Sequence, residues 1–205
     1  NKEERSAIAR CALALALLAN QCLDVCVPCQ LLNKPIDLLN LTPETDVEAS
    51  VDQIGRREAD SLTKCIARCC QCKAAIVEED ERETSGRRAI LNYGHTYGHA
   101  IEAVFGYGRF LHGEAIAIGM TCAARLARDL GMVQDSFVER QTELFRKMKL
   151  PVKCPTERHD ELIASMKHDK KVARGKLKLI LPVGVGEVVV LAAPDDQRIL
   201  DSLKN

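Results

Sequence analysis

Two histidines stand four residues apart in the segment LNYGHTYGHAIE, residues 91–102, and a glycine directly precedes each of them. A separation of four residues places the imidazoles of His95 and His99 on one face of a helix. The glycines leave the backbone open where a ligand or another helix could approach. His112 comes thirteen residues after His99, behind another glycine-containing turn, and Gly113 and Glu114 follow it. Three histidines so close in sequence can form a metal site with a catalytic base beside it, whereas any one alone is more often a hydrogen-bonded structural residue.

Charged and amide side chains lie just upstream of the histidines. They are Lys73, Asp80, Glu83, Arg88 and Asn92. Arginine binds carboxylate or phosphate through paired hydrogen bonds, lysine offers a point charge, and carboxylates and amides accept hydrogen bonds from hydroxyl groups. The set therefore suits a substrate with phosphate, carboxylate and several hydroxyls. Lys73 interrupts an apolar stripe, where a lysine either reaches solvent or meets a buried anion.

The spacing of apolar residues predicts that helices position these groups. Helices are expected over residues 7–19, from about 44 through the fifties, over 60–78, from about 89 through the histidine pair, and over 112–130, 135–149 and 158–168. GYGRF, residues 106–110, indicates a glycine-hinged loop before His112. KLKLILP and EVVVL flank VGVG, which predicts one short C-terminal β-hairpin near 176–191. The fold class expected is therefore mainly α.

Composition narrows the classes of protein. The chain of 205 residues suits one domain, and 29 basic residues balance 29 acidic ones. That balance gives no electrostatic reason to expect nucleic acid or an anionic membrane as a partner. Ten cysteines fall in apolar, helix-like segments, which favours buried thiols in a cytoplasmic protein over a disulfide scaffold. The apolar run 11–19 is too short to cross a bilayer, so we expect no membrane span.

Two shorter motifs suggest other chemistry, but the rest of the sequence lacks the features that each of them requires. CLDVCVPC, residues 22–29, has the cysteine spacing of a loop that holds an iron–sulfur cluster. The chain lacks the alternating strand–helix pattern of the barrel in which such a loop occurs. HGE at 112–114 is similar to the His-x-Glu of zinc deaminases, but the downstream Pro-Cys-x-x-Cys that those enzymes need does not follow.

The longest motif is KAAIVEEDERETSGRRAILNYGHTYGHAIEAVFGYGRFLHGEAIAIGMTCAARLA, and HDKKVARGKLKLILPVGVGEVVV follows it. These segments resemble the core signature and the C-terminal stretch of the 3-dehydroquinate synthase family. The resemblance covers roughly residues 45–203. Its parts are specific, because a histidine pair, an LHGEA and a DKK come in order at family-like spacing.

The resemblance implies a lyase of the shikimate pathway, which leads to the aromatic amino acids. Such an enzyme cyclises a phosphorylated seven-carbon keto-sugar acid to 3-dehydroquinate and releases phosphate. It uses NAD⁺ and a divalent metal, Zn²⁺ or another ion such as Co²⁺, and the resemblance implies a homodimer for the intact enzyme.

The resemblance also implies a role for each candidate residue. His95 and His112 would be metal ligands, and His99 with Glu83 would transfer protons. The substrate-binding residues would be Lys73, Asp80, Arg88 and Asn92, with Lys170 or Lys171 of the DKK motif holding an anionic group such as phosphate. An anion in the site would explain the place of Lys73 on an apolar stripe.

The sequence departs from the family near its start. Residues 1–44 form a divergent segment, and 45–205 are expected to be the helical metal- and substrate-binding domain. The family's third zinc ligand is a glutamate from an AEVIK-like helix, yet no glutamate occurs between Glu4 and Glu44. We find no dinucleotide-binding motif, because VGVG sits in a hairpin and not between a strand and a helix. We therefore expect a weaker metal site and little activity from these 205 residues alone.

Three alternatives stay open at this stage. The chain could be an inactive remnant, a partner subunit that completes its site with another polypeptide, or part of a related sugar-phosphate cyclase that acts on a different seven-carbon sugar. The forms GHAIEA and LHGEA favour dehydroquinate synthase.

Overall fold

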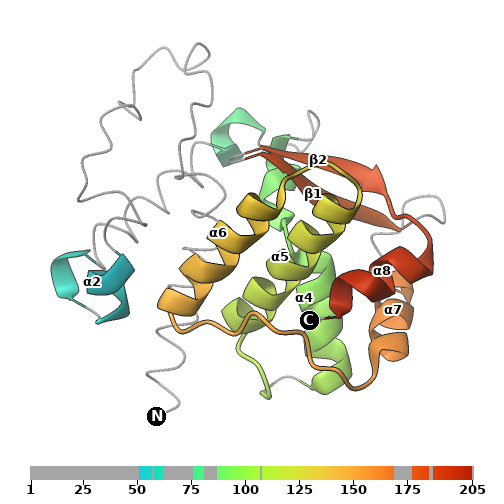
Figure 1. Cartoon of the computed structure of the whole chain (residues 1–205), viewed down its shortest axis with the longest axis horizontal. Helices are drawn as coiled ribbons and strands as arrows, with labels where there is room; N and C mark the ends of the chain where they lie inside the picture. The colour runs from blue at the N-terminus through green and yellow to red at the C-terminus, as the bar shows by residue number, and fades with distance from the viewer. Residues whose placement is uncertain are drawn as a thin grey trace.

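The computed structural model describes the C-terminal three quarters of the chain in segments. The described residues are 51–56, 58–61, 76–80, 87–106, 108–168, 177–184 and 187–204. Within them the helices are α2 Val51–Gly55, the 3-10 helix η2 Arg87–Asn92, α4 His95–Phe105, α5 His112–Asp129, α6 Asp135–Lys147, α7 His159–His168 and α8 Asp196–Leu203. The strands are β1 Lys178–Gly184 and β2 Glu187–Ala192. The mainly helical fold with one hairpin is as the sequence predicts (Figure 1).

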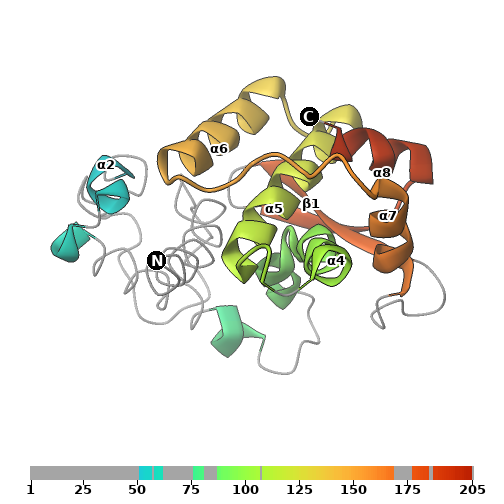
Figure 2. The same cartoon turned by 90° about the horizontal axis from the view of Figure 1, so that it is seen from below.

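Helix α5 forms the centre of the described core. Its alanine-rich sequence favours helix, and the backbone N–H of Leu111 donates to the Glu114 carboxylate at 2.8 Å in the first turn. Most of its side chains are buried, because it packs against α4, α6, α8 and β1. In both views α6 lies on one side of α5, and α7 and α8 lie on the other (Figures 1 and 2). Helix α5 is therefore the fixed support against which α4 is held.

Glycines allow α4 and α5 to approach closely. A Cβ on Gly98 would come within 2.5 Å of Ile116 Cδ1, and a Cβ on Gly119 would collide with the carbonyl oxygen of Gly94. Gly94 itself has a φ of 79°, a left-handed conformation that few other residues adopt. The glycines beside the histidines thus serve helix packing, which is one of the two roles that the sequence left open.

The same Gly94 changes where the histidine helix begins. The sequence predicts a helix from about residue 89, but the structure has the 3-10 helix η2 up to Asn92 and starts α4 at His95. The left-handed turn at Gly94 separates the two. His95 therefore opens a new helix, while Asn92 ends the preceding one.

The C-terminal hairpin is confirmed. Strands β1 and β2 are antiparallel, with Lys178 opposite Ala192 and Ile180 opposite Val190. Leu179 of β1 is buried at 1% exposure, because this face of the hairpin packs on α5. The helices expected over 112–130, 135–149 and 158–168 are also present as α5, α6 and α7.

Some helices differ from the prediction or lie where it cannot be compared with the structure. Helix α8 was not predicted; Asp195 caps it by accepting a hydrogen bond from the backbone N–H of Arg198 at 3.0 Å. The helix expected over 7–19 and most of the one over 60–78 lie outside the described residues. Among the helices that the structure does describe, none combines the length and the apolar character required to span a bilayer.

Two buried cysteines within the described residues belong to no disulfide. They are Cys122 of α5 and Cys154, which follows α6. A hydrogen bond with Cys154, together with burial, holds the pKa of the Cys122 thiol well above its usual range. These two residues therefore act as core side chains, as the composition predicts.

Candidate metal centre

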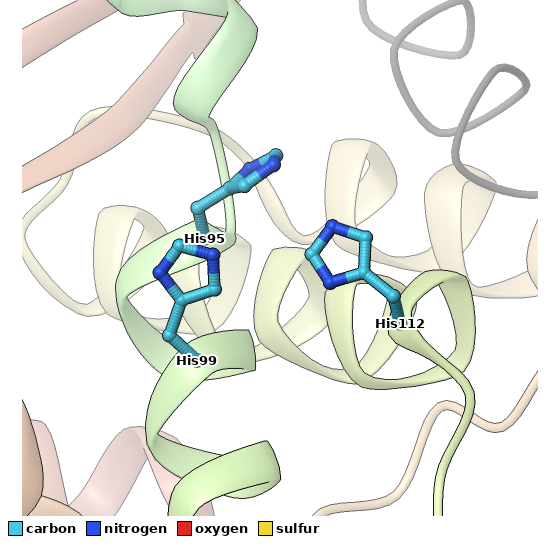
Figure 3. A group of neighbouring side chains, drawn as sticks. All are labelled: His95, His99 and His112. Carbon is cyan, nitrogen blue, oxygen red and sulfur yellow. The ribbon is translucent and has the colours of Figure 1, made fainter. Parts of the chain in front are cut away.

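The three histidines converge at the junction of α4 and α5. His95 is the first residue of α4, His99 lies one turn further along it, and His112 is the first residue of α5. Their ring centroids are 5.4 Å apart for His95 and His99, 5.7 Å for His95 and His112, and 5.9 Å for His99 and His112. One ring atom from each lies within 4.8 Å of those from the other two. Figure 3 shows the three rings facing a common space.

A buried carboxylate orients the His112 ring. Glu102 is 8% exposed on α4, and its two carboxylate oxygens lie 3.0 and 3.2 Å from His112 Nδ1. An ionised carboxylate only accepts hydrogen bonds, so Nδ1 carries the hydrogen and Nε2 is the ring atom left to bind a metal. Ligating histidines commonly have such a partner. Glu102 was not among the predicted site residues, although it follows His99 by three residues on the same helical face.

A backbone carbonyl orients His95 in the same way. His95 Nδ1 lies 3.2 Å from the carbonyl oxygen of Tyr93. The Tyr93 hydroxyl is 3.1 Å from the Met120 carbonyl oxygen and 3.1 Å from Gln141 Oε1. Burial holds the pKa of this hydroxyl far above its usual range, so it stays neutral and can donate. The turn before His95 is thereby fixed to α5 and α6, and Nε2 of His95 points away from the backbone acceptor.

This donor set fits zinc or cobalt. Neutral imidazole nitrogens are common ligands for both ions. Zinc–nitrogen bonds of about 2.0–2.1 Å in a tetrahedral site place ligand nitrogens about 3.3 Å apart. The ring atoms here lie within 4.8 Å of one another, so binding an ion requires the rings to move closer together. The His99 ring lies about as close to the rings of His95 and His112 as those two rings lie to each other.

A cavity of about 140 Å³ opens beside the cluster. Its polar lining consists of Asn92, His95, Thr96, His99 and Lys178. Apolar side chains from η2, α7 and both strands complete the walls. A small cavity with apolar walls and a few converging polar groups is typical of a ligand site. Thr96 and Lys178 were not among the predicted site residues.

Some of the remaining predicted residues lie within the described part of the chain. Asn92 lines the cavity together with His95 and His99. Asp80 is buried at 3% exposure, and its Oδ2 accepts a hydrogen bond from the backbone N–H of Arg88 at 3.2 Å. The others lie outside the described residues and are Lys73, Glu83, Lys170 and Lys171.

Comparison with known proteins matches residues 42–172 to the model of the 3-dehydroquinate synthase C-terminal domain. The chain belongs to the 3-dehydroquinate synthase family. The synthase of Rhodopirellula baltica is 44% identical over 147 residues, covering 72% of this chain and 39% of the relative. The synthase of a Synechocystis strain is 44% identical over 168 residues, covering 82% of this chain and 45% of the relative. The chain thus spans less than half the length of these curated relatives.

The solved structures of two synthases share the fold of this chain. A 2-epi-5-epi-valiolone synthase of Streptomyces hygroscopicus, with NAD⁺ and Zn²⁺ bound, aligns with a TM-score of 0.73 at 20% identity, over 96% of this chain and 50% of that one. A 2-deoxy-scyllo-inosose synthase in complex with carbaglucose-6-phosphate, NAD⁺ and Co²⁺ aligns with a TM-score of 0.59 at 23% identity, over 82% and 54% of the two chains.

Proposed function

We propose that this chain is the metal- and substrate-binding part of a 3-dehydroquinate synthase. The intact enzyme would cyclise a phosphorylated seven-carbon keto-sugar acid to 3-dehydroquinate with release of phosphate, and would work as a homodimer in the cytoplasm. The convergence of three histidines on one space carries this proposal, together with membership of the family. The Tyr93 carbonyl and the Glu102 carboxylate support the proposal further. Each can accept a hydrogen bond from Nδ1 of one histidine, His95 or His112, which would leave Nε2 of that ring for a metal.

In this proposal His95 and His112 hold Zn²⁺, or Co²⁺ in its place, through Nε2. Such an ion supplies Lewis acidity, which stabilises negative charge on a bound oxygen. The carbonyl of Tyr93 and the carboxylate of Glu102 keep the two rings in the tautomer that ligation needs. Glu102 is thus a positioning residue that the resemblance alone did not supply.

His99 would transfer a proton to or from the substrate. It lines the cavity beside Asn92, within reach of a substrate held at the metal. Asn92 would bind a substrate hydroxyl. We also propose the roles that the family resemblance implies for Asp80, Arg88, Lys73, Glu83, Lys170 and Lys171.

NAD⁺ would be bound mainly by another part of the intact enzyme. Hydride transfer needs the nicotinamide beside the substrate carbon, and a dinucleotide commonly binds at the edge of a parallel sheet. The sheet within the described residues is a two-stranded antiparallel hairpin. We therefore expect the 205-residue polypeptide to be inactive alone and to gain activity when a separately produced NAD-binding domain of a 3-dehydroquinate synthase is added.

Metal retention in histidine variants tests the proposed ligand set. His95→Ala and His112→Ala should each abolish retention of Zn²⁺, whereas His99→Ala should retain the metal and lower the activity of the reconstituted enzyme about 10²–10⁴-fold. His159→Ala is a matched control, because this histidine contacts the Pro155 carbonyl oxygen at 2.8 Å on α7. Metal content is measured after dialysis by atomic emission.

Two outcomes would change the proposal. Equal metal loss in all three variants would make His99 a third ligand and leave proton transfer to another group. Metal content that none of the three substitutions affects would make the cluster structural and would overturn the metal centre.

A further inference from the structure

Strand β1 presents two different faces. Side chains alternate between the faces of a strand, so Leu179 and Leu181, both 1% exposed, point into the core, and Lys178 and Ile180 point the other way. Val190, opposite Ile180 on β2, shares that second face. All three residues of the second face line the cavity beside the histidines. The hairpin therefore forms one wall of the candidate site.

The cavity is cationic in character. No carboxylate is among its lining residues, and Lys178 is the lining side chain that carries a full charge irrespective of histidine protonation. Within the described ranges, no carboxylate lies at ion-pair distance from Lys178, whereas Lys167 pairs with Asp196 and Lys204 pairs with Asp201. The Lys178 ammonium is thus an exposed charge at the edge of a small, partly apolar cavity.

We propose that Lys178 binds an anionic oxygen group of the substrate next to the histidine cluster. The inference rests on the proposed function, because it concerns the ligand of that same site, and it adds a binding residue to those assigned by the family resemblance. Ile180 and Val190 line the cavity beside Lys178, so an anionic ligand there would contact apolar surface as well as the ammonium. The exposed Val190, 45% accessible, also supplies apolar surface that a bound ligand would cover.

Carboxylate and phosphate share the chemistry that an ammonium recognises. Both present anionic oxygens that accept hydrogen bonds from Nζ. A neutral polyol would gain little from Lys178. The residue therefore favours acidic or phosphorylated sugars over neutral ones, and the two anion classes can be separated by titrating each alone.

The test titrates the 205-residue chain with inorganic phosphate and, separately, with acetate, at low salt. The imidazole C–H resonances of His95 and His99 report binding by nuclear magnetic resonance, with and without Zn²⁺. Lys178→Met should weaken binding of the preferred anion about tenfold. This is the lower end of the loss expected for a charge-assisted hydrogen bond, because Lys178 is exposed to solvent. Lys178→Arg should retain most of the affinity. Added salt should weaken binding to the wild type more than to Lys178→Met.

Lys167→Met is the matched control, because it removes an exposed lysine of α7 that pairs with Asp196 away from the cavity. It should leave anion affinity unchanged. Equal affinities of Lys178→Met and wild type would overturn the inference, as would absence of saturable binding of either anion by the wild type. These results differ from failure of the proposed function, which would appear as loss of Zn²⁺ binding whatever the residue at position 178.

Discussion

Replacing Glu102 tests whether the α4 carboxylate prepares His112 for metal binding. Glu102→Gln keeps an oxygen acceptor beside Nδ1 but removes the charge, and Glu102→Ala removes both. The contact is short, 3.0 Å, and the carboxylate is buried, whereas the His112 side chain is 40% exposed. Solvent therefore screens part of the charge attraction, and the main effect expected is lost orientation of the ring.

The expected size follows from the type of contact. Removing an outer partner of a metal-ligating histidine costs about 10–100-fold in metal affinity, or about 1.4–2.7 kcal/mol. Glu102→Ala should show this full loss, because the His112 ring can then rotate about its side-chain bonds. Glu102→Gln should fall between Glu102→Ala and the wild type, because its amide oxygen can still accept from Nδ1.

The measurement is competition for Zn²⁺ between the protein and a chromophoric chelator, and Co²⁺ absorption reports the ligand geometry. Glu114→Gln is the control, because it removes a charge two residues from His112 while glutamine can still accept from Leu111 N–H in the first turn of α5. Its metal affinity should stay near that of the wild type. Circular dichroism confirms that each variant is folded. Wild-type affinity in folded Glu102→Ala would refute the positioning role, and equal losses in Glu102→Gln and Glu114→Gln would attribute the effect to net charge.

Two further predictions concern stability. Gly119→Ala should destabilise the fold by about 1–3 kcal/mol or more, because the new Cβ meets backbone atoms of Gly94 and Gly98 that cannot move independently; an unchanged thermal midpoint would contradict the tight α4–α5 contact. Burial holds the pKa of the Tyr97 hydroxyl well above its usual value despite a hydrogen bond with Ser202. Its contribution to stability is therefore complete below about pH 10, where an unfolded tyrosine ionises, and is lost as pH rises further. In Tyr97→Phe the free energy of unfolding should therefore fall less steeply above that pH. Denaturant titrations at several pH values measure this, and the same pH dependence in the variant and the wild type would contradict the prediction.

The sequence predicts the elements whose periodicity is long and uninterrupted. Helices α5, α6 and α7 and the hairpin lie where the apolar spacing places them. Helix α8 has only 8 residues, so its pattern is short, although Asp195 is a recognisable N-cap. The start of α4 was placed too early, because the left-handed turn at Gly94 depends on close packing against Met120 of α5. That contact joins residues far apart in the sequence.

In the candidate site, too, some positions follow from local sequence spacing and others depend on tertiary contacts. Spacing within one helix indicates that His95 and His99 share a face, and the structure brings His112 to them. Local spacing places Glu102 on the helical face of His99, but its contact with His112 and the position of Lys178 at the cavity depend on tertiary packing. Glu102 meets His112 because the loop after α4 returns the chain to the start of α5. Lys178 reaches the cavity because the other face of β1 packs on α5.

Different hydrogen-bond partners give the buried carboxylates of Asp80 and Glu102 different roles. Both are nearly inaccessible and both accept a hydrogen bond, Asp80 from the backbone N–H of Arg88 and Glu102 from a histidine ring. A buried carboxylate is stable only when such partners compensate for lost hydration. In Asp80 one of these partners is the backbone at the start of η2, so its charge helps to fix the element that carries Asn92. The partner of Glu102 is the ring of His112, a predicted metal ligand, so this carboxylate orients a side chain of the candidate metal centre.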